Sequence, residues 1–286
     1  TPQKVNIKLF RQGPKDIRLN DTKISQKELI GTLNTVIFCP EDLQLIKGTP
    51  SGRRRFLDME ISQTSATYYH QLMQYNRLLQ QRNAVLKEYR GKQNIPLEEW
   101  DLQLADMASF IVKKRLESLK KINLLIDLMN RKLTGGLENL TIGYEQPYMD
   151  NGSLEYTKEG FYERIKAALP QDRHRLTTSV GPHRDDLRFF SDAMDLKKFG
   201  SQGQQRTAVL SLKLSELEFI KSEVGEYPVL LLDDVLSELD ESRRANLLQF
   251  IHKRIQTFIT TTDIHDFKDL KSVQFISCEG GKVQYG

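Results

Sequence analysis

The pattern of apolar and polar positions divides the chain into a β-rich start, a long helical middle and a mixed remainder. Apolar residues alternate with polar ones over 5–9 and again over 17–19, on either side of a turn at Gly13-Pro14. Alternation with a period of two is typical of half-buried strands. Together with a further apolar run at 35–38, this pattern predicts an antiparallel β meander.

Two long helices are predicted in the middle of the chain. Apolar residues recur at the three- and four-residue spacing of an amphipathic helix over 68–89 and again over 100–133. Two such helices joined by a short loop form an antiparallel hairpin. We therefore expect a helical hairpin arm over residues 52–135, with 1–51 and 136–286 together forming a head.

After the arm, strands and helices alternate as in an α/β protein. Helical patterns are predicted at 160–169, 207–221 and 242–255, and strands at 140–144, 187–189, 228–232 and 258–262, before a hairpin around Gly280-Gly281. The run at 228–232 has almost no polar residue, which is typical of a strand buried inside a parallel sheet.

Composition excludes several classes of protein. The 286 residues are 38% hydrophobic and 28% charged, which is too apolar for a disordered chain, and no apolar run reaches the ~20 residues of a membrane span. Two distant cysteines exclude a disulfide framework and a cysteine-based zinc site, and favour a reducing compartment. A net charge of +4 permits nucleic-acid binding without arguing for it.

The strand predicted at 228–232 ends abruptly in two acids, Asp233 and Asp234. Open α/β sheets bind ligands at the carboxyl ends of their strands. In a nucleotide-hydrolysing site Asp233 would hold Mg²⁺, and Asp234 would orient or deprotonate the attacking water. The alternative, that the pair only caps a strand and begins a turn, stays open.

A short segment with two glycines, Gly200–Arg206, directly precedes the helix predicted from Thr207. Free backbone N–H groups at the positive end of a helix suit a phosphate group. Ser201 would add a hydroxyl donor, and Gly203 would let the backbone approach a ligand closely. A flexible loop that only caps the helix is the alternative.

The order of these elements carries more information than either element alone. A serine-glycine-glutamine helix start, a long helix, an apolar strand ending Asp-Asp and then Val235–Asp240 follow the order of the signature motif, Walker B motif and D-loop of ATP-binding-cassette ATPases. Segments 200–207 and 231–240 closely resemble the bacterial RecF family, and so do 179–186 and the blocks within 40–58.

The resemblance implies an ABC-ATPase-like head, with a mixed sheet and an antiparallel meander, carrying an inserted helical arm. It also implies ATP and Mg²⁺ as cofactors. The residues that it assigns to the site are Ser201, Gly203, Gln204 and Asp240 for ATP binding, Asp233 for the metal and Asp234 for catalysis.

The function that the resemblance implies is that of a DNA-binding ATPase of recombinational repair. Such a protein would form an ATP-dependent homodimer, act on double-stranded DNA and at single-strand gaps and junctions, and help to load recombinase together with RecR. It would hydrolyse ATP weakly in a DNA-dependent way, take part in the response to DNA damage, and reside in the cytoplasm, associated with the nucleoid and not with a membrane.

The chain departs from the family pattern at two places. No GxxxxGK[ST] Walker A motif occurs, so we expect the family's Walker A segment to lie upstream of Thr1 and the 286 residues alone to bind ATP poorly. At the switch position, where transporter ATPases have histidine, the chain has Thr262 followed by Asp263.

Two other classes of function compete with this interpretation. The motor subunit of a transporter would need a switch histidine and a surface that couples to membrane helices, and Thr262 and the long arm argue against it. A non-enzymatic scaffold with relic motifs would have a broken signature or Walker B motif, and both are intact here.

Two charged clusters remain. His183, Asp185 and Asp186 form too small a set for a metal site, so we expect a structural or interface role, with Arg184 as a candidate for a phosphate or inter-subunit contact.

The second cluster, Arg53-Arg54-Arg55, opens a predicted helix, where positive charge opposes the helix dipole. We therefore expect the sheet, a carboxylate or a DNA phosphate to hold these arginines, with a solvated face as the alternative.

Overall fold

The structure is a computed structural model that describes residues 3–92, 95–136, 138–148, 156–262, 267 and 273–285. Its elements, in chain order, are β1 (Val5–Lys8), β2 (Asp16–Leu19), β3 (Thr22–Lys23), β4 (Thr35–Phe38), η1 (Pro40–Leu43), α1 (Gln44–Lys47), α2 (Pro50–Thr64), α3 (Ala66–Glu88), α4 (Glu98–Thr134), β5 (Leu140–Glu145), α5 (Lys158–Ala167), α6 (Leu169–Arg175), β6 (Asp186–Ser191), β7 (Met194–Asp195), α7 (Leu196–Phe199), α8 (Gln202–Val224), β8 (Val229–Asp233), η2 (Leu236–Glu238), α9 (Glu241–Ile251), β9 (Thr257–Thr260), β10 (Ile276–Glu279) and β11 (Lys282–Tyr285).

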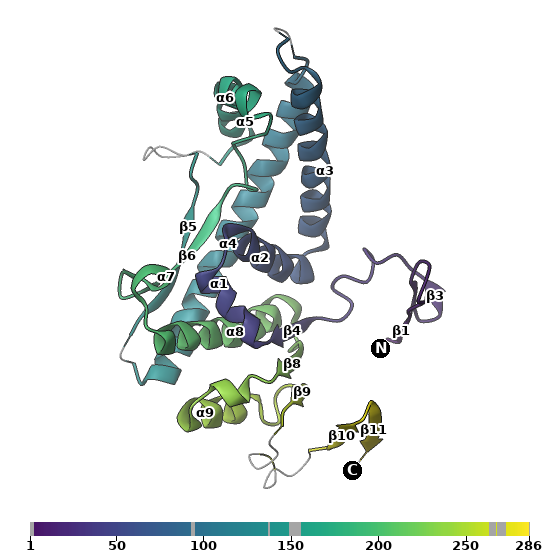
Figure 1. Cartoon of the computed structure of the whole chain (residues 1–286), viewed down its shortest axis with the longest axis vertical. Coiled ribbons are helices and arrows are strands. Elements are labelled where there is room, and N and C mark those ends of the chain that lie inside the picture. Colours follow the sequence, from purple (N-terminus) through teal and green to yellow (C-terminus); the bar gives the residue numbers. More distant parts are fainter. Residues whose placement is uncertain are drawn as a thin grey trace.

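A parallel sheet in the order β4-β8-β9 lies between α8 and α9 in the view of Figure 1. Its central strand β8 is the apolar run whose sequence predicted a parallel sheet, and that prediction is confirmed. Val36, Leu230 and Leu232 are buried on one face of the sheet. Ile37 and Phe258 lie on the other face and are about half exposed, at 51% and 54%.

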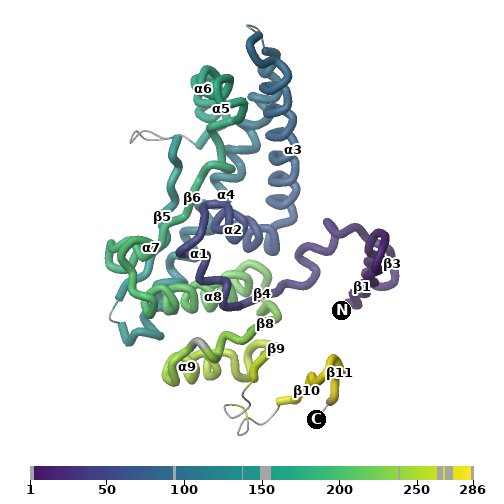
Figure 2. The backbone as a smooth tube through the Cα atoms, viewed as in Figure 1, coloured from purple at the N-terminus to yellow at the C-terminus, as the bar shows by residue number. Residues whose placement is uncertain are grey.

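The prediction that residues 35–38 belong to the N-terminal meander is wrong. The meander consists of β1, β2 and β3, and β4 instead pairs in parallel with β8, with Thr35 opposite Val229. A short apolar run has no periodicity that identifies its partner strand, so the pairing depends on contacts with residues about 190 positions away. Figure 2 shows the meander and the β10–β11 hairpin at the outside of the molecule.

The described residues of the helical middle form three helices. The two predicted long helices are α3 and α4, which lie antiparallel side by side (Figure 1), and α2 precedes them as a separate helix. At 1.5 Å per residue the 37-residue α4 is about 55 Å long. It ends at Gly135, whose φ of 70° is the left-handed conformation that glycine adopts easily at a helix end.

The boundaries of three other helices differ from the prediction. Helix α6 begins at Leu169, where the sequence predicted a helix end before Pro170, because proline is well tolerated in a first turn. Helix α8 begins at Gln202, five residues early, because Ser201 caps it. Helix α9 ends at Ile251, and Lys253 then adopts a left-handed φ of 58°.

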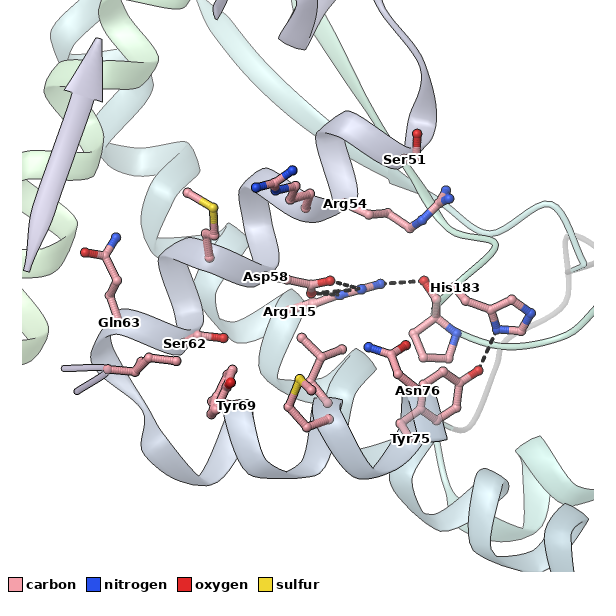
Figure 3. Close-up of a pocket in the computed structure, with 16 residues that line it drawn as sticks. Ser51, Arg54, Asp58, Ser62, Gln63, Tyr69, Tyr75, Asn76, Arg115 and His183 are labelled. Carbon is pink, nitrogen blue, oxygen red and sulfur yellow. Dashed lines mark hydrogen bonds and ion pairs between the residues drawn. The ribbon is translucent and has the colours of Figure 1, made fainter. Parts of the chain in front are cut away.

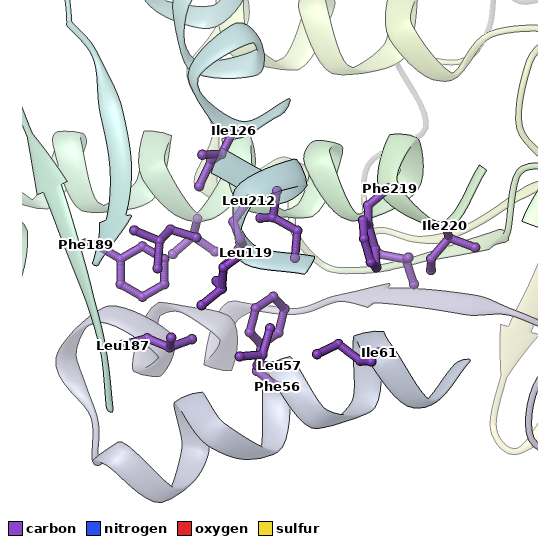
Figure 4. Packing of buried hydrophobic residues seen from close by; sticks show 14 of the residues in the cluster. Phe56, Leu57, Ile61, Leu119, Ile126, Leu187, Phe189, Leu212, Phe219 and Ile220 are labelled. Atoms are coloured by element: carbon purple, nitrogen blue, oxygen red, sulfur yellow. The ribbon is translucent and has the colours of Figure 1, made fainter. Parts of the chain in front are cut away.

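One hydrophobic core joins the helical middle to the remainder of the chain. Figure 4 shows Phe56 and Leu57 of α2 meeting Leu119 of α4, Phe189 of β6 and Leu212 of α8. Helix α8 is buried around most of its circumference, including polar positions such as Ser211 and Ser215. Since α8 begins at the signature motif segment and α4 packs along it, the arm and the candidate site share one framework. Within the described ranges, no helix has the length and apolar content that crossing a bilayer requires.

Candidate functional site

The first acid of the pair lies at the carboxyl edge of the parallel sheet. Asp233 is the last residue of β8, is exposed, and lies opposite Thr260 of β9 in the strand register. The Thr260 hydroxyl donates a hydrogen bond of 2.6 Å to Asp233 Oδ1. The carboxylate is therefore held in one orientation at the carboxyl end of the strand, where the sequence predicted the acid to lie.

The second acid begins a tight turn. Asp234 has a left-handed φ of 51°, a conformation that aspartate tolerates better than most residues. Its backbone N–H donates to Thr260 Oγ1 at 3.1 Å, and its carbonyl accepts a bond of 2.8 Å from the Ser237 hydroxyl. One threonine hydroxyl thus accepts from the backbone of Asp234 and donates to Asp233, which fixes both acids relative to each other.

The signature segment forms the N-terminal cap of α8. Ser201 Oγ accepts from the Gln204 N–H at 3.2 Å, and Gln204 Oε1 accepts from the Ser201 N–H at 3.0 Å, which completes a capping box. Gly203 lies in the first turn and is exposed. A Cβ built at Gly203 would meet only Ser201 Oγ, at 4.0 Å, so packing within the chain does not require glycine there.

Gln204 has both ends of its side chain engaged within the protein. Besides the bond to Ser201, its Nε2 donates to Glu138 Oε1 at 3.0 Å, and Glu138 Oε2 accepts from Ser191 at 3.0 Å. Gln204 therefore ties the start of α8 to the segment before β5 and to β6. Its predicted contact with ATP stays a prediction.

Asp240 caps the next helix. Its Oδ1 accepts from the Arg243 N–H at 3.0 Å, at the start of α9, and its Oδ2 pairs with the Arg243 guanidinium. The backbone hydrogen bond from Arg243 is the main cause that lowers the pKa of Asp240. The carboxylate is exposed, six residues beyond Asp234 along the D-loop.

The two motif segments approach the same edge of the sheet. A small hollow is lined by Phe38 and Cys39 at the end of β4, Val235 after β8, and Arg206 and Val209 of α8. The first turns of α8 therefore lie against the carboxyl ends of β4 and β8. Among the described residues, no hydrogen bond joins Ser201 or Gln204 to either acid, so the chain by itself brings the segments near one edge without linking them.

The arginine triplet has three different environments. Arg53 makes a two-pronged ion pair with Asp186, at 2.7 and 2.8 Å. Arg54 donates to the Asp185 carbonyl at 2.8 Å. Arg55 is exposed at a cavity beside α2. The expectation that a carboxylate holds these charges is therefore confirmed for Arg53 alone.

The His183 segment is held by internal contacts. His183 Nε2 lies 3.0 Å from the Thr178 carbonyl, so it carries the proton there, and Nδ1 accepts from Tyr75 at 2.6 Å. Burial lowers the pKa of His183 to about 4, so the ring is neutral at neutral pH. Arg184 also donates to the Thr178 carbonyl.

No group of three or more His, Cys, Asp or Glu residues suited to a metal ion occurs in the part of the chain that the structure describes. Asp185, the central acid of the predicted cluster, accepts instead from the Tyr144 hydroxyl and lies 3.7 Å from Arg115. Burial is the main cause that raises the pKa of Asp185 to about 6.

Sequence reasoning missed the buried arginine that organises this region. Arg115 of α4 is 2% exposed, makes a two-pronged pair with Asp58 at 2.9 and 3.0 Å, and donates to the Pro182 carbonyl at 2.7 Å. The available indication was its position: a charged residue at 115 interrupts the apolar stripe between Val112 and Leu119. No comparable pattern in the sequence indicated that Thr260 orients the acid pair.

Comparisons with known proteins identify the family. No protein-family model matches the chain. The DNA replication and repair protein RecF of Alkaliphilus oremlandii (strain OhILAs) is 47% identical over 270 residues, covering 93% of this chain and 73% of that protein. RecF of Clostridium botulinum (strain Eklund 17B / Type B) is 45% identical over 282 residues, covering 97% of this chain and 77% of that protein.

Solved structures agree with the fold class. The recombination mediator protein RecF bound to ATP, from the RecFOR pathway, superposes with a TM-score of 0.89 at 36% identity, over 99% of this chain and 76% of that one. The Smc head domain of Pyrococcus furiosus, at a TM-score of 0.50 and 14% identity over 99% of this chain and 71% of that one, shares the fold alone. The predicted ABC-ATPase-like α/β fold is confirmed, and the chain belongs to the RecF family of DNA replication and repair proteins.

Proposed function

We propose that this protein is an ATPase of recombinational DNA repair and that the carboxyl edge of β8 is its hydrolytic centre. The observation that carries the proposal is the acid pair Asp233-Asp234 at the end of a central parallel strand, oriented by the single hydroxyl of Thr260. Membership of the RecF family and the similarity to a RecF structure with ATP support the nucleotide.

The donor chemistry of Asp233 suits Mg²⁺. Magnesium prefers hard oxygen ligands and is usually held by one or two carboxylates together with substrate phosphates. Thr260 occupies Oδ1 of Asp233, and Oδ2 accepts no hydrogen bond from any described residue. Asp233 is therefore proposed to hold the ion, which when bound would neutralise charge on the phosphates.

Asp234 is proposed to orient the attacking water. Its carboxylate is exposed and forms no hydrogen bond with the described residues, while three hydrogen bonds fix its backbone N–H and carbonyl. Many cassette ATPases have glutamate at this position, and aspartate is one methylene shorter. Since a misplacement of about 1 Å costs on the order of 100-fold in rate, we expect slow, DNA-stimulated hydrolysis in which ATP acts as a clamp and timer.

The start of α8 is proposed to contact the nucleotide of a second subunit. Glycine inside a helix costs about 0.5–1 kcal/mol relative to alanine, and packing gives no reason for Gly203. The backbone N–H groups of Gln202 and Gly203 have no acceptor among the described residues. These free donors at the positive end of a 23-residue helix suit a phosphate that only dimerisation would bring. Ser201, Gly203, Gln204 and Asp240 would then complete the ATP site.

We propose a DNA-binding role for the arm, and membership of the RecF family of DNA replication and repair proteins supports it. We propose residues 1–51 and 136–286 as the head and 52–135 as the arm, so that ATP-driven dimerisation brings two arms together over DNA. Backbone contacts from lysine and arginine would give salt-dependent binding with little sequence preference. Action at gaps and junctions, with RecR as partner, in the cytoplasm near the nucleoid, belongs to the same proposal.

The test is Asp234→Asn in the complete protein. We expect ATP hydrolysis to fall at least about 100-fold, because the amide does not accept a proton from water, while ATP affinity changes less than about twofold. Steady-state phosphate release and equilibrium ATP binding measure the two quantities. Undiminished hydrolysis would remove Asp234, and this edge of the sheet, from the catalytic role.

A further inference from the structure

A cavity of about 570 Å³ opens between α2 and α3 (Figure 3), and none of the site residues at the sheet edge lines it. Its two main walls are single helix faces, since the lining positions recur every three or four residues on each helix. They include Arg54, Arg55 and Met59 on α2, and Tyr69, Met73 and Asn76 on α3. The volume lies within the range of pockets that hold small ligands, about 300–1,000 Å³.

The α2 wall carries more positive than negative charge. Asp58 is neutralised by its two-pronged pair with the buried Arg115. Among the described residues Arg54 donates only to the Asp185 backbone carbonyl, and burial, followed by the charge of Arg115, lowers its pKa. Arg55 is exposed and has no carboxylate within ion-pair distance among the described residues.

Neighbouring groups do not cancel this excess. Asp186 is already paired with Arg53 at 2.7 Å. His183, which also lines the cavity, is neutral at neutral pH because burial lowers its pKa to about 4. Two guanidinium groups, those of Arg54 and Arg55, therefore line one opening without an ion pair to any described carboxylate. Such a pair favours an anion with several acceptor oxygens.

The remaining lining is apolar and aromatic. Met59 and Met73 line the cavity and are 50% and 41% exposed, so their thioethers are open to a ligand. Tyr69 is half-buried, and Figure 3 shows it on α3 beside the cavity, with Asn76 about two turns further along the helix. Neither side chain forms a hydrogen bond with the described residues. An aromatic ring, thioethers and a free amide suit a flat group with an apolar face and a polar edge.

We infer that this cavity binds one unpaired nucleotide of a DNA single strand. Its phosphate would lie against Arg54 and Arg55, and its base against Met59, Met73 and Tyr69, with Asn76 at the polar edge of the base. A paired base stays within its stack and would not enter, so the site would respond to unpaired DNA rather than duplex. The inference rests on the proposed function as a DNA-binding protein, and it names a site for the unpaired strand.

The test compares single-stranded and duplex DNA in the complete protein. We expect Arg55→Glu to weaken binding of a 20-nucleotide oligo-dT on the order of 10-fold and to reduce its salt slope by about 0.7, the share of one phosphate contact on a single strand. Tyr69→Ala should weaken the same binding on the order of 10-fold by loss of stacking. Binding of a 20-base-pair blunt duplex should change less than about twofold in Tyr69→Ala.

The control is Arg77→Glu, which reverses an exposed arginine on α3 that does not line the cavity. It should bind oligo-dT like the wild type. Circular dichroism and ATP binding verify that each variant is folded.

The outcomes distinguish a failure of the proposed DNA-binding function from a failure of the inferred nucleotide site. If the wild type binds neither DNA, the proposed function fails and this inference fails with it. If the wild type binds oligo-dT and both cavity variants bind it equally well, the inference alone is overturned. Displacement of oligo-dT by an oligo-glutamate peptide but not by thymidine monophosphate would assign the cavity to an acidic protein segment, and would also overturn it.

Discussion

The exposed sheet edge and the buried ion pairs of the helical region use charged residues in opposite ways. At the edge, Asp233 and Asp234 are exposed and are oriented by one threonine hydroxyl. Three of their four carboxylate oxygens accept no hydrogen bond from a described residue. In the helical region, Arg115 is 2% exposed and its donors are filled by Asp58, tyrosine hydroxyls and a carbonyl.

Arg82 repeats the buried arrangement. It is fully buried, and it donates to Asp101 at 2.6 Å, to Asp172 at 2.7 Å and to Thr178 at 2.9 Å. These bonds join α3, α4, α6 and the segment before β6. The comparison teaches that buried charges paired within the chain mark residues that hold the fold, whereas exposed, oriented carboxylates with free acceptors mark residues that meet a ligand.

The largest expected effect on stability comes from breaking a buried pair. Arg115→Met leaves Asp58 and Asp185 without their cation, and removing one partner of a buried ion pair costs about 3–5 kcal/mol. Urea unfolding followed by circular dichroism measures the loss. Asp234→Asn, a charge removed at the exposed edge, is the control and should change the unfolding free energy by less than about 0.5 kcal/mol. Equal losses in the two variants would erase the distinction between the regions.

The second effect depends on pH and concerns Glu60 of α2. Glu60 is buried beside Lys213 and Glu216 of α8. Lys213 forms ion pairs with Glu216 and with Asp42 of η1, and its ammonium lies over the ring of Phe56. Burial raises the pKa of Glu60 from 4.5 to about 7. Between these two pH values the folded chain therefore binds more protons than the unfolded chain. The unfolding free energy consequently falls as pH rises from 4.5 to about 7.

Glu60→Gln removes this proton uptake and keeps the shape of the side chain. Between about pH 5 and pH 8 we expect the wild type to lose about 1–3 kcal/mol relative to the variant. Urea titrations of both proteins at matched ionic strength measure the difference. A wild type that gains stability relative to Glu60→Gln as pH rises would reverse the assigned sign.

The smallest effect on stability concerns the helix cap at the signature segment. Ser201→Arg removes the hydroxyl that accepts from the Gln204 N–H, which costs about 1 kcal/mol. In the complete protein we expect it to leave ATP binding to the monomer nearly intact, to prevent ATP-driven dimerisation and to weaken ATP-stimulated DNA binding. Sedimentation with and without ATP tests this, and a variant that still dimerises on ATP would contradict the proposed contact between subunits.

The parts that could be predicted from the sequence are local. The apolar run before Asp233 predicted a buried parallel strand, and the spacing over 100–133 predicted α4, because each property is contained in a few neighbouring residues. The fold class and family followed from the order of the motifs.

Pairings between distant segments could not be predicted. Arg115 and Asp58 are 57 positions apart, and Arg82 and Asp172 are 90 apart, so no local pattern encodes either contact. The same applies to the partner strand of β4. The sequence also did not predict the cavity at Arg55. Successive positions of a helix point in different directions, so Arg53 meets a carboxylate, Arg54 meets a carbonyl and Arg55 faces solvent.

The central claim is that the exposed edge acts on the nucleotide while the buried pairs hold the fold, and Asp233→Asn in the complete protein tests it most directly. We expect magnesium-dependent ATP hydrolysis to fall at least about 100-fold, since the amide is a poor ligand for the ion, with a change in unfolding free energy below about 0.5 kcal/mol. A magnesium titration of hydrolysis and a urea titration, made on the same preparation, give both numbers. Unchanged hydrolysis, or a stability loss as large as that of Arg115→Met, would contradict the claim.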